Sequence, residues 1–410
     1  MKERVAYKFR IYPDLDQARL FRRTVGCCRL VYNACLRAKK EAWAEEKVNL
    51  TAFDQIKTIP ALKEQYPFLR EVPNHCLQQA VVDLHRGYRN FFEGRASFPK
   101  PRRKYRNESF RFPDPKQVMF RDGAIFLPKA RWVGMVAHRE IVGTVKNVTV
   151  SLSGDHWYAS IQVEREVDEP LQVSDAEAVE RGCDLGVVNA LAMDDGEVFD
   201  LPRMGEREKR KEENLHRIVS RRKKGSRNRA KALRALRAFK ARIVRRRKDA
   251  KHRATTAVVR SCDVIYLEDL RVRNLTASAR GTVEEPGKNV AQKAGSNRAM
   301  LDVSPGETRL QIEYKMRRKG GEVYFVNPAY TSQRCAECGH VEAGNRPDRD
   351  TFRCLSCGHA ACADANAARN ILHLGRKART GGHPGMACEA NPGAGRQQEE
   401  DGCSQAAQPA

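Results

Sequence analysis

Two pairs of cysteines near the C-terminal end of the chain have the spacing of metal ligands. The motifs CAEC and CLSC, with fifteen residues between them, supply Cys335, Cys338, Cys354 and Cys357. Each pair is followed by Gly-His, which is typical of a tight turn. Four thiolates at this spacing fill a tetrahedral zinc site and leave no open position for catalysis. We therefore expect a structural zinc ribbon, in which His340 and His359 are turn residues rather than ligands.

Three acidic residues lie in segments that otherwise look buried or small. Asp184 lies within the strand-like GCDLGV, Glu268 follows the apolar run VIYL, and Asp364 begins the helical segment DANAARNIL. A buried carboxylate costs several kcal/mol unless it is paired or binds a metal. Taken singly, the three acids are better explained as a turn residue, a surface acid at a strand end and a helix N-cap, respectively.

Taken together, the three acids fit a metal-dependent phosphodiesterase. Carboxylates from two adjacent strands and a nearby helix can hold two divalent ions about 4 Å apart, one activating a water and the other stabilising the leaving 3′ oxygen. Carboxylate and water ligands favour Mg²⁺ or Mn²⁺ over zinc. The interpretation makes Asp184, Glu268 and Asp364 the catalytic and magnesium-binding residues.

The overall charge points to a polyanionic partner. The 410 residues include 76 Lys and Arg against 51 Asp and Glu, a net charge of +25. The commonest partner for such an excess is a nucleic acid backbone, although a basic but ordinary enzyme remains the simpler alternative. No apolar run has the length of a membrane span, and the first residues carry charges where a signal peptide is apolar. We expect a cytoplasmic protein with no membrane partner.

Most of the 13 cysteines stand singly among apolar neighbours. In a reducing compartment such residues are small core side chains more often than disulfide partners. We assign this role to Cys27, Cys28, Cys35, Cys76, Cys183 and Cys262.

The N-terminal half predicts strands and two amphipathic helices. The expected strands are residues 5–13, 117–128, 143–154 and 156–166, and the expected helices are 14–46 and 71–94. Asp14 is placed to cap the first helix, and a Ser-Gly-Asp turn joins the last two strands in a hairpin. The polar, acidic residues 167–180 indicate a linker.

Between these elements, residues 98–113 alternate basic and aromatic side chains and are held extended by prolines. This mixture suits phosphate contact with base stacking, though a solvated linker would look similar. The basic candidates for nucleic acid contact are Arg102, Arg103 and Lys104. The aromatic residues that either stack on bases or belong to the core are Phe98, Tyr105 and Phe110.

The C-terminal half begins with a predicted buried strand from Arg181 to Met193. Residues 203–253 form the most basic stretch, where KKGSRN supplies a turn between two antiparallel helices. Because its charge is nearly all of one sign, a counter-charged partner is favoured over a merely solvated face. The apolar stripe of these helices is Leu233, Leu236, Phe239 and Ile243. The candidates for nucleic acid contact here are Arg221, Arg222, Lys223 and Lys224. Beyond them we expect a strand at 262–270, a mobile loop at 280–297, a helix at 304–321 and a strand at 322–328.

The order of these motifs resembles the RuvC-type nuclease core of the insertion-sequence TnpB (OrfB) family, which comprises compact relatives of type V CRISPR effectors. The resemblance rests on GCDLG, a basic helical insertion, IYLEDL, CxxC–CxxC and DANAARNIL in that order. It extends over roughly residues 2–374, since KFRIYPDLDQ and NPAYTSQRCAECG also look like family segments. The resemblance implies a transposon-encoded, RNA-guided DNA endonuclease, in which Asp184, Glu268 and Asp364 match the family's three catalytic acids.

The resemblance also implies partners and a fold. A guide RNA from the transposon end would pair with one strand of double-stranded target DNA beside a short flanking motif, in a bacterial or archaeal, nucleoid-associated protein. The fold would be α/β, with an RNase H-like (RuvC) nuclease core carrying an inserted zinc ribbon, plus an N-terminal β-barrel with a helical recognition insert. The expected parts are the first barrel strand (1–13), the helical recognition region (14–112), the rest of the barrel (113–170), the core (178–330, with the basic insertion 203–253), the ribbon (331–360), the last core helix (361–375) and a disordered tail (376–410).

Three positions depart from the family pattern without removing a ligand: Cys183, Cys362 and the SPG turn at 304–306, whose proline is expected to disturb the nearby loop. Two other function classes remain open. One is a nuclease-silent, RNA-guided DNA-binding regulator, which a lost carboxylate would favour. The other is a protein-guided transposase or resolvase that acts without RNA.

Overall fold

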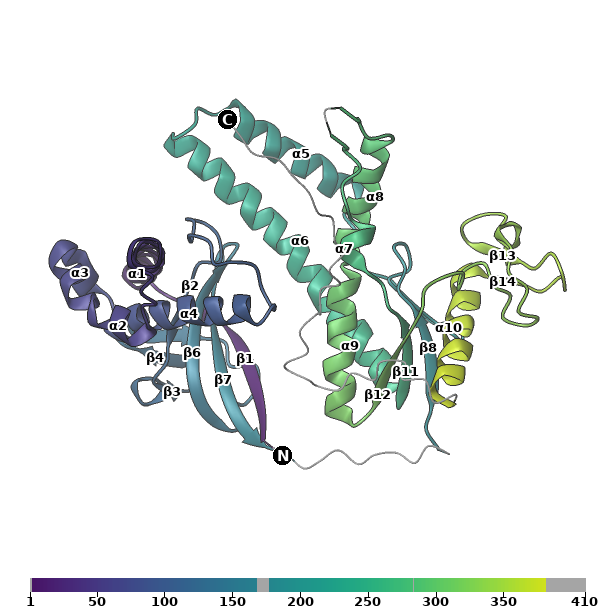
Figure 1. The fold of residues 1–410 in the computed structure, drawn as a ribbon, viewed down its shortest axis with the longest axis horizontal. Helices are drawn as coiled ribbons and strands as arrows, with labels where there is room; N and C mark the ends of the chain where they lie inside the picture. The colour runs from purple at the N-terminus through teal and green to yellow at the C-terminus, as the bar shows by residue number, and fades with distance from the viewer. Residues whose placement is uncertain (1, 168–176, 283, 381–410) are drawn as a thin grey trace. The chain divides into compact units, whose positions relative to one another are not determined.

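The computed structural model describes residues 2–167, 177–282 and 284–380 (Figure 1). The chain divides into two compact units, a first unit that ends at Asp168 and a second unit that begins at Glu169. Most of the predicted linker and residues 381–410 of the predicted tail lie outside the described residues. None of the helices that the structure describes is long and apolar enough to cross a membrane.

The first unit is built on one seven-stranded antiparallel sheet of order β2-β6-β7-β1-β5-β4-β3. Its strands are β1 (Lys2–Tyr12), β2 (Ser109–Phe112), β3 (Met119–Arg121), β4 (Ala124–Leu127), β5 (Arg131–Met135), β6 (Thr144–Ser153) and β7 (His156–Glu166). The order ends at β2 and β3, and no pairing joins these two strands within the described residues. The closed barrel therefore stays a prediction.

The strands differ from the sequence prediction in three places, of which the first is β2, a strand within the segment 98–113 that was expected only to be extended. The predicted hairpin of β6 and β7 is confirmed. The predicted strand 117–128 is instead a hairpin of β3 and β4, turning at Gly123, whose φ of 68° favours glycine. Strand β5 was not predicted, because only Val133 and Met135 of its five residues are buried and the alternation is short.

Four helices lie between β1 and β2 in the chain: α1 (Leu15–Glu46), α2 (Ala52–Lys57), α3 (Ile59–Gln65) and α4 (Asn74–Phe92), with the 3₁₀ turn η1 (Pro67–Glu71) before α4. The predicted cap is confirmed, since Asp14 Oδ1 accepts a hydrogen bond from the Gln17 backbone N–H at 2.8 Å. The Gln17 side chain accepts one from the Asp14 N–H at 3.1 Å, which completes a capping box. The buried faces of α1 and α4 share one core with the sheet.

The second unit is built on a mixed five-stranded sheet of order β10-β9-β8-β11-β12. Its strands are β8 (Glu180–Asp184), β9 (Leu191–Met193), β10 (Val198–Phe199), β11 (Val264–Glu268) and β12 (Glu322–Val326). Strands β8, β11 and β12 are parallel neighbours, and β9 and β10 run antiparallel. The single strand predicted to reach Met193 is wrong, because the chain turns after Asp184 and returns as β9.

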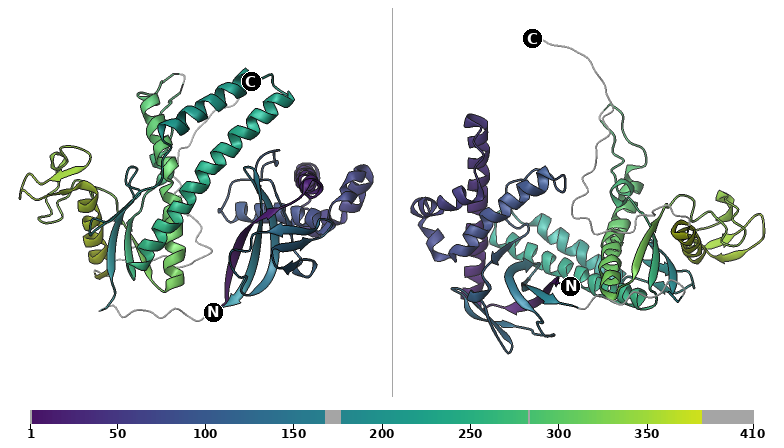
Figure 2. Two further views of the ribbon diagram at one scale, coloured as in Figure 1. Left: turned by 180° about the vertical axis from the view of Figure 1, so that it is seen from behind. Right: turned by 60° about the horizontal axis from the view of Figure 1, so that its bottom comes forward.

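Helices cover both faces of this sheet. Helices α6 (Arg227–Arg260) and α9 (Pro305–Lys319) lie on one face and α10 (Ala363–Thr380) on the other (Figures 1 and 2). Leu267 of β11 belongs to a buried cluster with Val258 of α6 and Ile312 of α9. Its neighbour Tyr266 belongs to a different cluster with Ile371 of α10. The strand is therefore buried on both faces, which explains its continuous apolar run.

The basic stretch forms the predicted pair of antiparallel helices, α5 (Glu206–Arg221) and α6. Arg246 of α6 donates two hydrogen bonds to Glu208 of α5, at 3.0 and 2.7 Å. The apolar stripe is confirmed at its three buried members, which are Leu236, Phe239 and Ile243.

The loop predicted at 280–297 is wrong in its second half. After the short α7 (Val272–Leu275), helix α8 (Val290–Val303) begins within that range. Only Val303 of α8 is buried, so the sequence carries no periodic apolar signal. The SPG turn starts α9 with Pro305 in its first turn, where proline's missing N–H is not needed.

The ribbon strands β13 (Thr351–Arg353) and β14 (Ala360–Cys362) lead into α10. Two further 3₁₀ turns are η2 (Pro115–Gln117) and η3 (Ala343–Asn345). Helix α10 continues to Thr380, so the tail predicted from residue 376 begins too early. Arg376 and Arg379 donate to Glu180 at 2.5 and 2.8 Å and hold this end of the helix on the sheet. The six cysteines predicted as core residues are all buried.

Candidate active site

Strand alternation brings Asp184 and Glu268 to one face of the second sheet. Gly182 lies against α10, because a Cβ built there would be 2.1 Å from a backbone oxygen of that helix. Tyr266 packs toward the same helix. Side chains two residues apart in a strand share a face, so Asp184 and Glu268 also point to the α10 side. Their strands are parallel neighbours that pair Cys183 with Leu267, so the two carboxylates lie at the same end of the sheet.

Asp364 comes to this place from the first turn of α10. Its Oδ2 accepts a hydrogen bond from Asn189 Nδ2 at 2.8 Å. Asn189 belongs to the turn that joins β8 to β9, and this turn begins directly after Asp184. The structure therefore brings the three predicted acids together from two strands and one helix.

The three carboxylates affect one another electrostatically. Burial, and then the negative charges of Glu268 and Asp364, raise the pKa of Asp184 to about 7, although the charge of Arg346 acts to lower it. Burial also raises the pKa of Glu268. Buried carboxyl groups with raised pKa values, such as Asp184 and Glu268, are stabilised in their charged form by added positive charge, which favours the binding of divalent cations.

Glu268 is held by a residue that the sequence analysis did not single out. Its side chain accepts a hydrogen bond from the Thr331 hydroxyl at 2.5 Å, and the two residues are only 7% and 3% exposed. The Thr331 carbonyl in turn accepts a hydrogen bond from Asn370 of α10 at 3.0 Å. Arg346, which acts on Asp184, comes from the loop between the two cysteine pairs.

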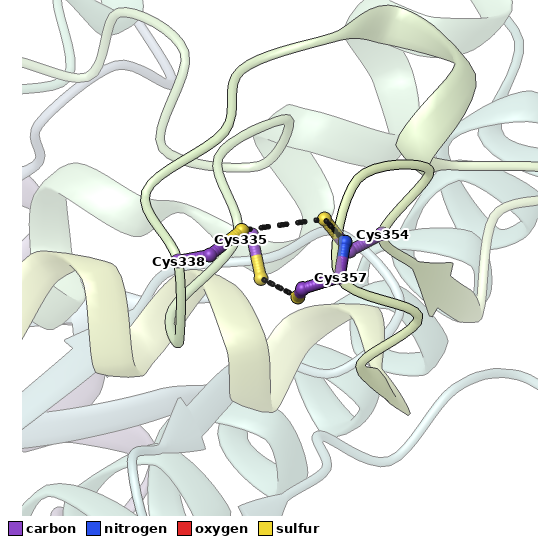
Figure 3. A group of neighbouring side chains, drawn as sticks. All are labelled: Cys335, Cys338, Cys354 and Cys357. Carbon is purple, nitrogen blue, oxygen red and sulfur yellow. Dashed lines mark hydrogen bonds between the residues drawn. The ribbon is translucent and has the colours of Figure 1, made fainter.

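The four predicted zinc ligands converge (Figure 3). Cys335, Cys338, Cys354 and Cys357 have sulfur atoms that all lie within 4.8 Å of one another, so they form a four-cysteine metal-binding site. The backbone N–H of Cys357 lowers the pKa of the Cys354 thiol to about 6, which favours the thiolate that metals bind. Within the described residues, the carboxylate oxygens of the three acids do not all lie within this 4.8 Å of one another.

The two Gly-His pairs build the turns, as predicted. The N–H of Cys335 donates to the His340 carbonyl at 2.9 Å, and that of Cys354 donates to the His359 carbonyl at 2.8 Å. Gly339 adopts a φ of 77°, which other residues rarely adopt.

Two buried asparagines tie the ribbon to α10. Asn366 and Asn370 are 0% and 1% exposed. Both donate to the Arg334 carbonyl, at 2.8 and 2.6 Å, and Asn366 also accepts from the Ala336 N–H at 3.0 Å. The helix that carries Asp364 is thereby joined to the first cysteine turn. The only sequence signal for this role is the pair of amides four residues apart in an otherwise small-residue helix.

The predicted nucleic acid contacts at 102–104 divide into two kinds. Arg102 has partners within the first unit, because its guanidinium lies 4.1 Å from the Tyr32 ring centre and 3.5 Å from Asp83. Arg103 and Lys104 are exposed. Of the three, these two residues have side chains more open to a phosphate backbone.

The candidates at the turn between α5 and α6 are all exposed: Arg221, Arg222, Lys223 and Lys224. Further along the helical hairpin, acidic residues of α5 form ion pairs with several cations of α6. For example, Glu212 lies 3.1 Å from Lys240. The cations of the turn therefore remain candidates for nucleic acid contact.

Comparison with known proteins places the chain in a family. It is 38% identical over 403 residues, 95% of this chain and 94% of the other, to the "Putative RNA-guided DNA endonuclease InsQ" of Escherichia coli K12. The chain belongs to the TnpB (OrfB) family. A second relative of similar extent, the "Putative RNA-guided DNA endonuclease" of Streptomyces pristinaespiralis, is 30% identical over 90% of this chain and 89% of its own.

Family models agree with this assignment to the TnpB family. The OrfB model described as "Probable transposase" matches residues 160–279, and the "Cas12f1-like, TNB domain" model matches 306–371. An OrfB model described as "Helix-turn-helix domain" matches residues 1–47, which form the single strand β1 and the single helix α1. Among solved structures, the chain is similar to the "Cas12f1-sgRNA-target DNA complex", with 12% identity, a TM-score of 0.46 and coverage of 90% of this chain and 98% of the other.

Proposed function

We propose that this TnpB-family chain is an RNA-guided DNA endonuclease that hydrolyses phosphodiester bonds at Asp184, Glu268 and Asp364. The observation that carries the proposal is the convergence of these acids, with the pKa of Asp184 raised to about 7. Both long relatives are named as RNA-guided DNA endonucleases. The partners would be a guide RNA from the transposon end and double-stranded DNA beside a short flanking motif.

The strand order supports an RNase H-like (RuvC) core for the second unit. Three strands, β10, β9 and β8, are antiparallel, and β11 and β12 continue parallel to β8. In this proposal the ribbon is inserted between the strand that carries Glu268 and the helix that carries Asp364. The first unit would supply the β-barrel and the helical recognition insert.

The donor sets fit two kinds of metal. The four cysteines suit structural zinc, and the three carboxylates suit two Mg²⁺ or Mn²⁺ ions. Such ions, when bound, would activate the attacking water and stabilise the leaving 3′ oxygen. The chain itself orients the ligands: Thr331 holds Glu268, and Asn189 holds Asp364.

The test is guide-dependent cleavage by the full chain. The protein is expressed with its native flanking DNA, and any RNA that co-purifies is sequenced. The complex is then incubated with Mg²⁺ and plasmids that carry the matching target beside randomised flanks. We expect cleavage that Asp184→Ala abolishes and that Asp249→Ala, a change at an exposed acid of α6, leaves intact.

The other outcomes select between the alternatives. Bound RNA with target binding but no cuts would replace the nuclease with an RNA-guided regulator. No bound RNA would leave a protein-guided transposase or resolvase. Cleavage that persists in Asp184→Ala would place the active site elsewhere.

A further inference from the structure

A group of aromatic side chains stands at the C-terminal end of α4, here named the aromatic cluster. Its members are Tyr88, Phe91, Phe92 and Phe98. The Phe98 ring centre lies 5.2 Å from that of Phe91 and 5.4 Å from that of Tyr88. Phe92 is 77% exposed, whereas Tyr88 is 7% exposed and anchors the group in the core. Large apolar rings left this open are a feature of binding surfaces.

The segment after α4 is fixed in place, so the cluster is preorganised. Pro99 lies against α4, 3.5 Å from where a Cβ of Gly87 would be. Asn33 of α1 accepts a hydrogen bond from the Arg102 backbone N–H at 2.7 Å and donates one to the Arg102 carbonyl at 3.1 Å. Phe98 therefore lies between the end of α4 and the anchored residues Pro99 and Arg102, and a ligand would pay little entropy to order it.

The surroundings of the cluster are strongly positive. Residues 86–106 contain eight Lys and Arg and one acid, Glu93, which forms an ion pair with Arg95. The eight cations are Arg86, Arg89, Arg95, Lys100, Arg102, Arg103, Lys104 and Arg106. From α1, Lys40 Nζ lies 5.0 Å from the Phe98 ring centre. Cations alternate with exposed rings in the manner of surfaces that take nucleic acid strands.

The charge decides between possible occupants. A second copy of the chain would bring the same cations against this surface, and the like charges would repel. An apolar protein segment would cover the rings but offer no negative charge to exposed cations such as Arg89 and Arg103. A nucleic acid strand supplies phosphates for the cations and a flat face for the rings.

We propose that the aromatic cluster is a stacking site for an unpaired base of RNA or DNA, whose flanking phosphates contact Arg89 and Arg103. The inference takes its partner class from the proposed function but not its cleavage chemistry. Because Phe92 is the most exposed ring, it is the one against which a base would stack.

The experiment measures binding of fluorescent oligonucleotides to the full chain. The probes are uniform single strands of RNA and of DNA, about 12 nucleotides long, and a DNA duplex of equal length. We expect Phe92→Ala to weaken single-strand binding roughly 5- to 100-fold. Phe92→Leu, which keeps apolar bulk but no π face, should weaken it similarly, and Phe92→Trp should retain it. Whichever of the two single strands loses more affinity identifies the source of the base.

The controls separate stacking from charge and from folding. Phe53→Ala removes another exposed ring, 65% exposed and with Lys57 Nζ 4.4 Å from its centre, and should change nothing. Between about 50 and 200 mM salt, Phe92→Ala should leave the slope of log K against log salt unchanged, whereas Arg103→Gln should reduce it by about one.

Three results would overturn the inference: Phe92→Ala binding every probe like the wild type, Phe92→Leu binding like the wild type, or Phe92→Ala converting a dimer to a monomer in light scattering. The test requires no cleavage, so loss of guided nuclease activity and loss of base stacking are separate outcomes.

Discussion

At the scale of single residues, the candidate active site is a concentration of negative charge that the protein fold itself does not favour. Asp184 has a pKa raised to about 7 by burial and then by the neighbouring acids. The surrounding structure keeps this carboxyl buried although its charged form is unfavourable there, which is common at binding sites. The unfavourable charge would be relieved when cations bind.

Because the charged form of Asp184 is unfavourable in the folded chain, we predict that Asp184→Asn stabilises the metal-free protein and abolishes cleavage. The folded pKa lies above the ordinary value of 3.8, so the folded chain holds a proton that the unfolded chain releases between these two values. The stability contributed by this carboxyl therefore falls as the pH rises from 4 and is lost above 7. Near pH 8, without Mg²⁺, we expect the asparagine variant to gain about 1–4 kcal/mol in unfolding free energy.

Thermal melts at several pH values check this prediction. The advantage of the asparagine variant should shrink as the pH is lowered toward 4, because protonated Asp184 carries no charge. Asp249→Asn, at an exposed acid with an i,i+4 partner, should change stability by under about 0.5 kcal/mol at each pH. An asparagine variant that is less stable than the wild type near pH 8 would contradict the argument.

Thr331 is predicted to position Glu268 for metal binding. Thr331→Val keeps the shape of the side chain but removes the hydroxyl that lies 2.5 Å from Glu268. Loss of such an outer partner commonly costs about 10–100-fold in metal affinity. We expect the Mg²⁺ concentration for half-maximal cleavage to rise by that factor, and Thr331→Ser to restore it. An unchanged Mg²⁺ midpoint in the valine variant would assign Thr331 a packing role only.

The acids could be recognised from the sequence, but their supporting residues could not. Each acid carries a local signal, being a charge inside a strand or helix pattern. Thr331 is 63 positions from Glu268, and Asn189 is 175 from Asp364. Polar residues in loops have many ordinary roles, and only the folded chain shows which of them meet an acid.

At the scale of elements, the close approach of α10 to β8 places Asp364 beside Asp184. Gly182 allows this approach, since a Cβ there would lie 2.1 Å from the Ala368 carbonyl oxygen and 2.8 Å from the Leu372 backbone nitrogen. Gly375 has the same role further along α10, where a Cβ would lie 2.0 Å from the Tyr266 ring.

Gly182→Ala should therefore displace α10 and destabilise the second unit. The contacts are with backbone, which cannot move aside, so the loss should reach or exceed the 1–3 kcal/mol typical of overpacking. Urea unfolding measures it, and cleavage should fall with it. Gly306→Ala is the matched control, because a Cβ at this position in α9 meets nothing within 4 Å. Equal stability of the two variants would show that α10 adjusts freely.

Elements were predictable in proportion to the strength of their periodic pattern. Helix α1 has nine buried residues along one face, and the sequence identifies it and its cap. Helix α8 buries one residue, and β9 has three residues, so neither has a window long enough to show a period. The turn between β8 and β9 was hidden because the apolar residues on both sides of it are buried.

At the scale of the whole molecule, the two units have separate cores. The core of the first unit joins its sheet to α1 and α4, and that of the second joins its sheet to α6 and α9. The boundary between the two units near residue 167 could be predicted from the polar composition of the chain there. The predicted barrel rests on the family resemblance alone, because pairing between the end strands of the first sheet depends on curvature rather than on a local pattern.

We predict that loss of the metal from the four-cysteine site disturbs the candidate active site but leaves the structure of the first unit unchanged. Without metal, the first cysteine turn would lose the constraint that holds Arg334 and Ala336 against Asn366 and Asn370. Thr331 lies four residues before the first ligand, Cys335, and donates a hydrogen bond to Glu268, so disorder in this segment would release one of the three proposed catalytic acids.

Cys354→Ser should therefore lower cleavage by at least about 10–100-fold at saturating Mg²⁺. Hydrogen exchange should quicken at residues 331–336 and in the first turns of α10, whereas β1 and β7 of the first unit should exchange as in the wild type. Cys362→Ser, at an exposed cysteine outside the metal-binding set, is the matched control and should leave exchange and cleavage unchanged. Full protection of α10 in Cys354→Ser would mean that the active site is assembled without the ribbon. Faster exchange in β1 and β7 as well would mean that the two units do not unfold independently.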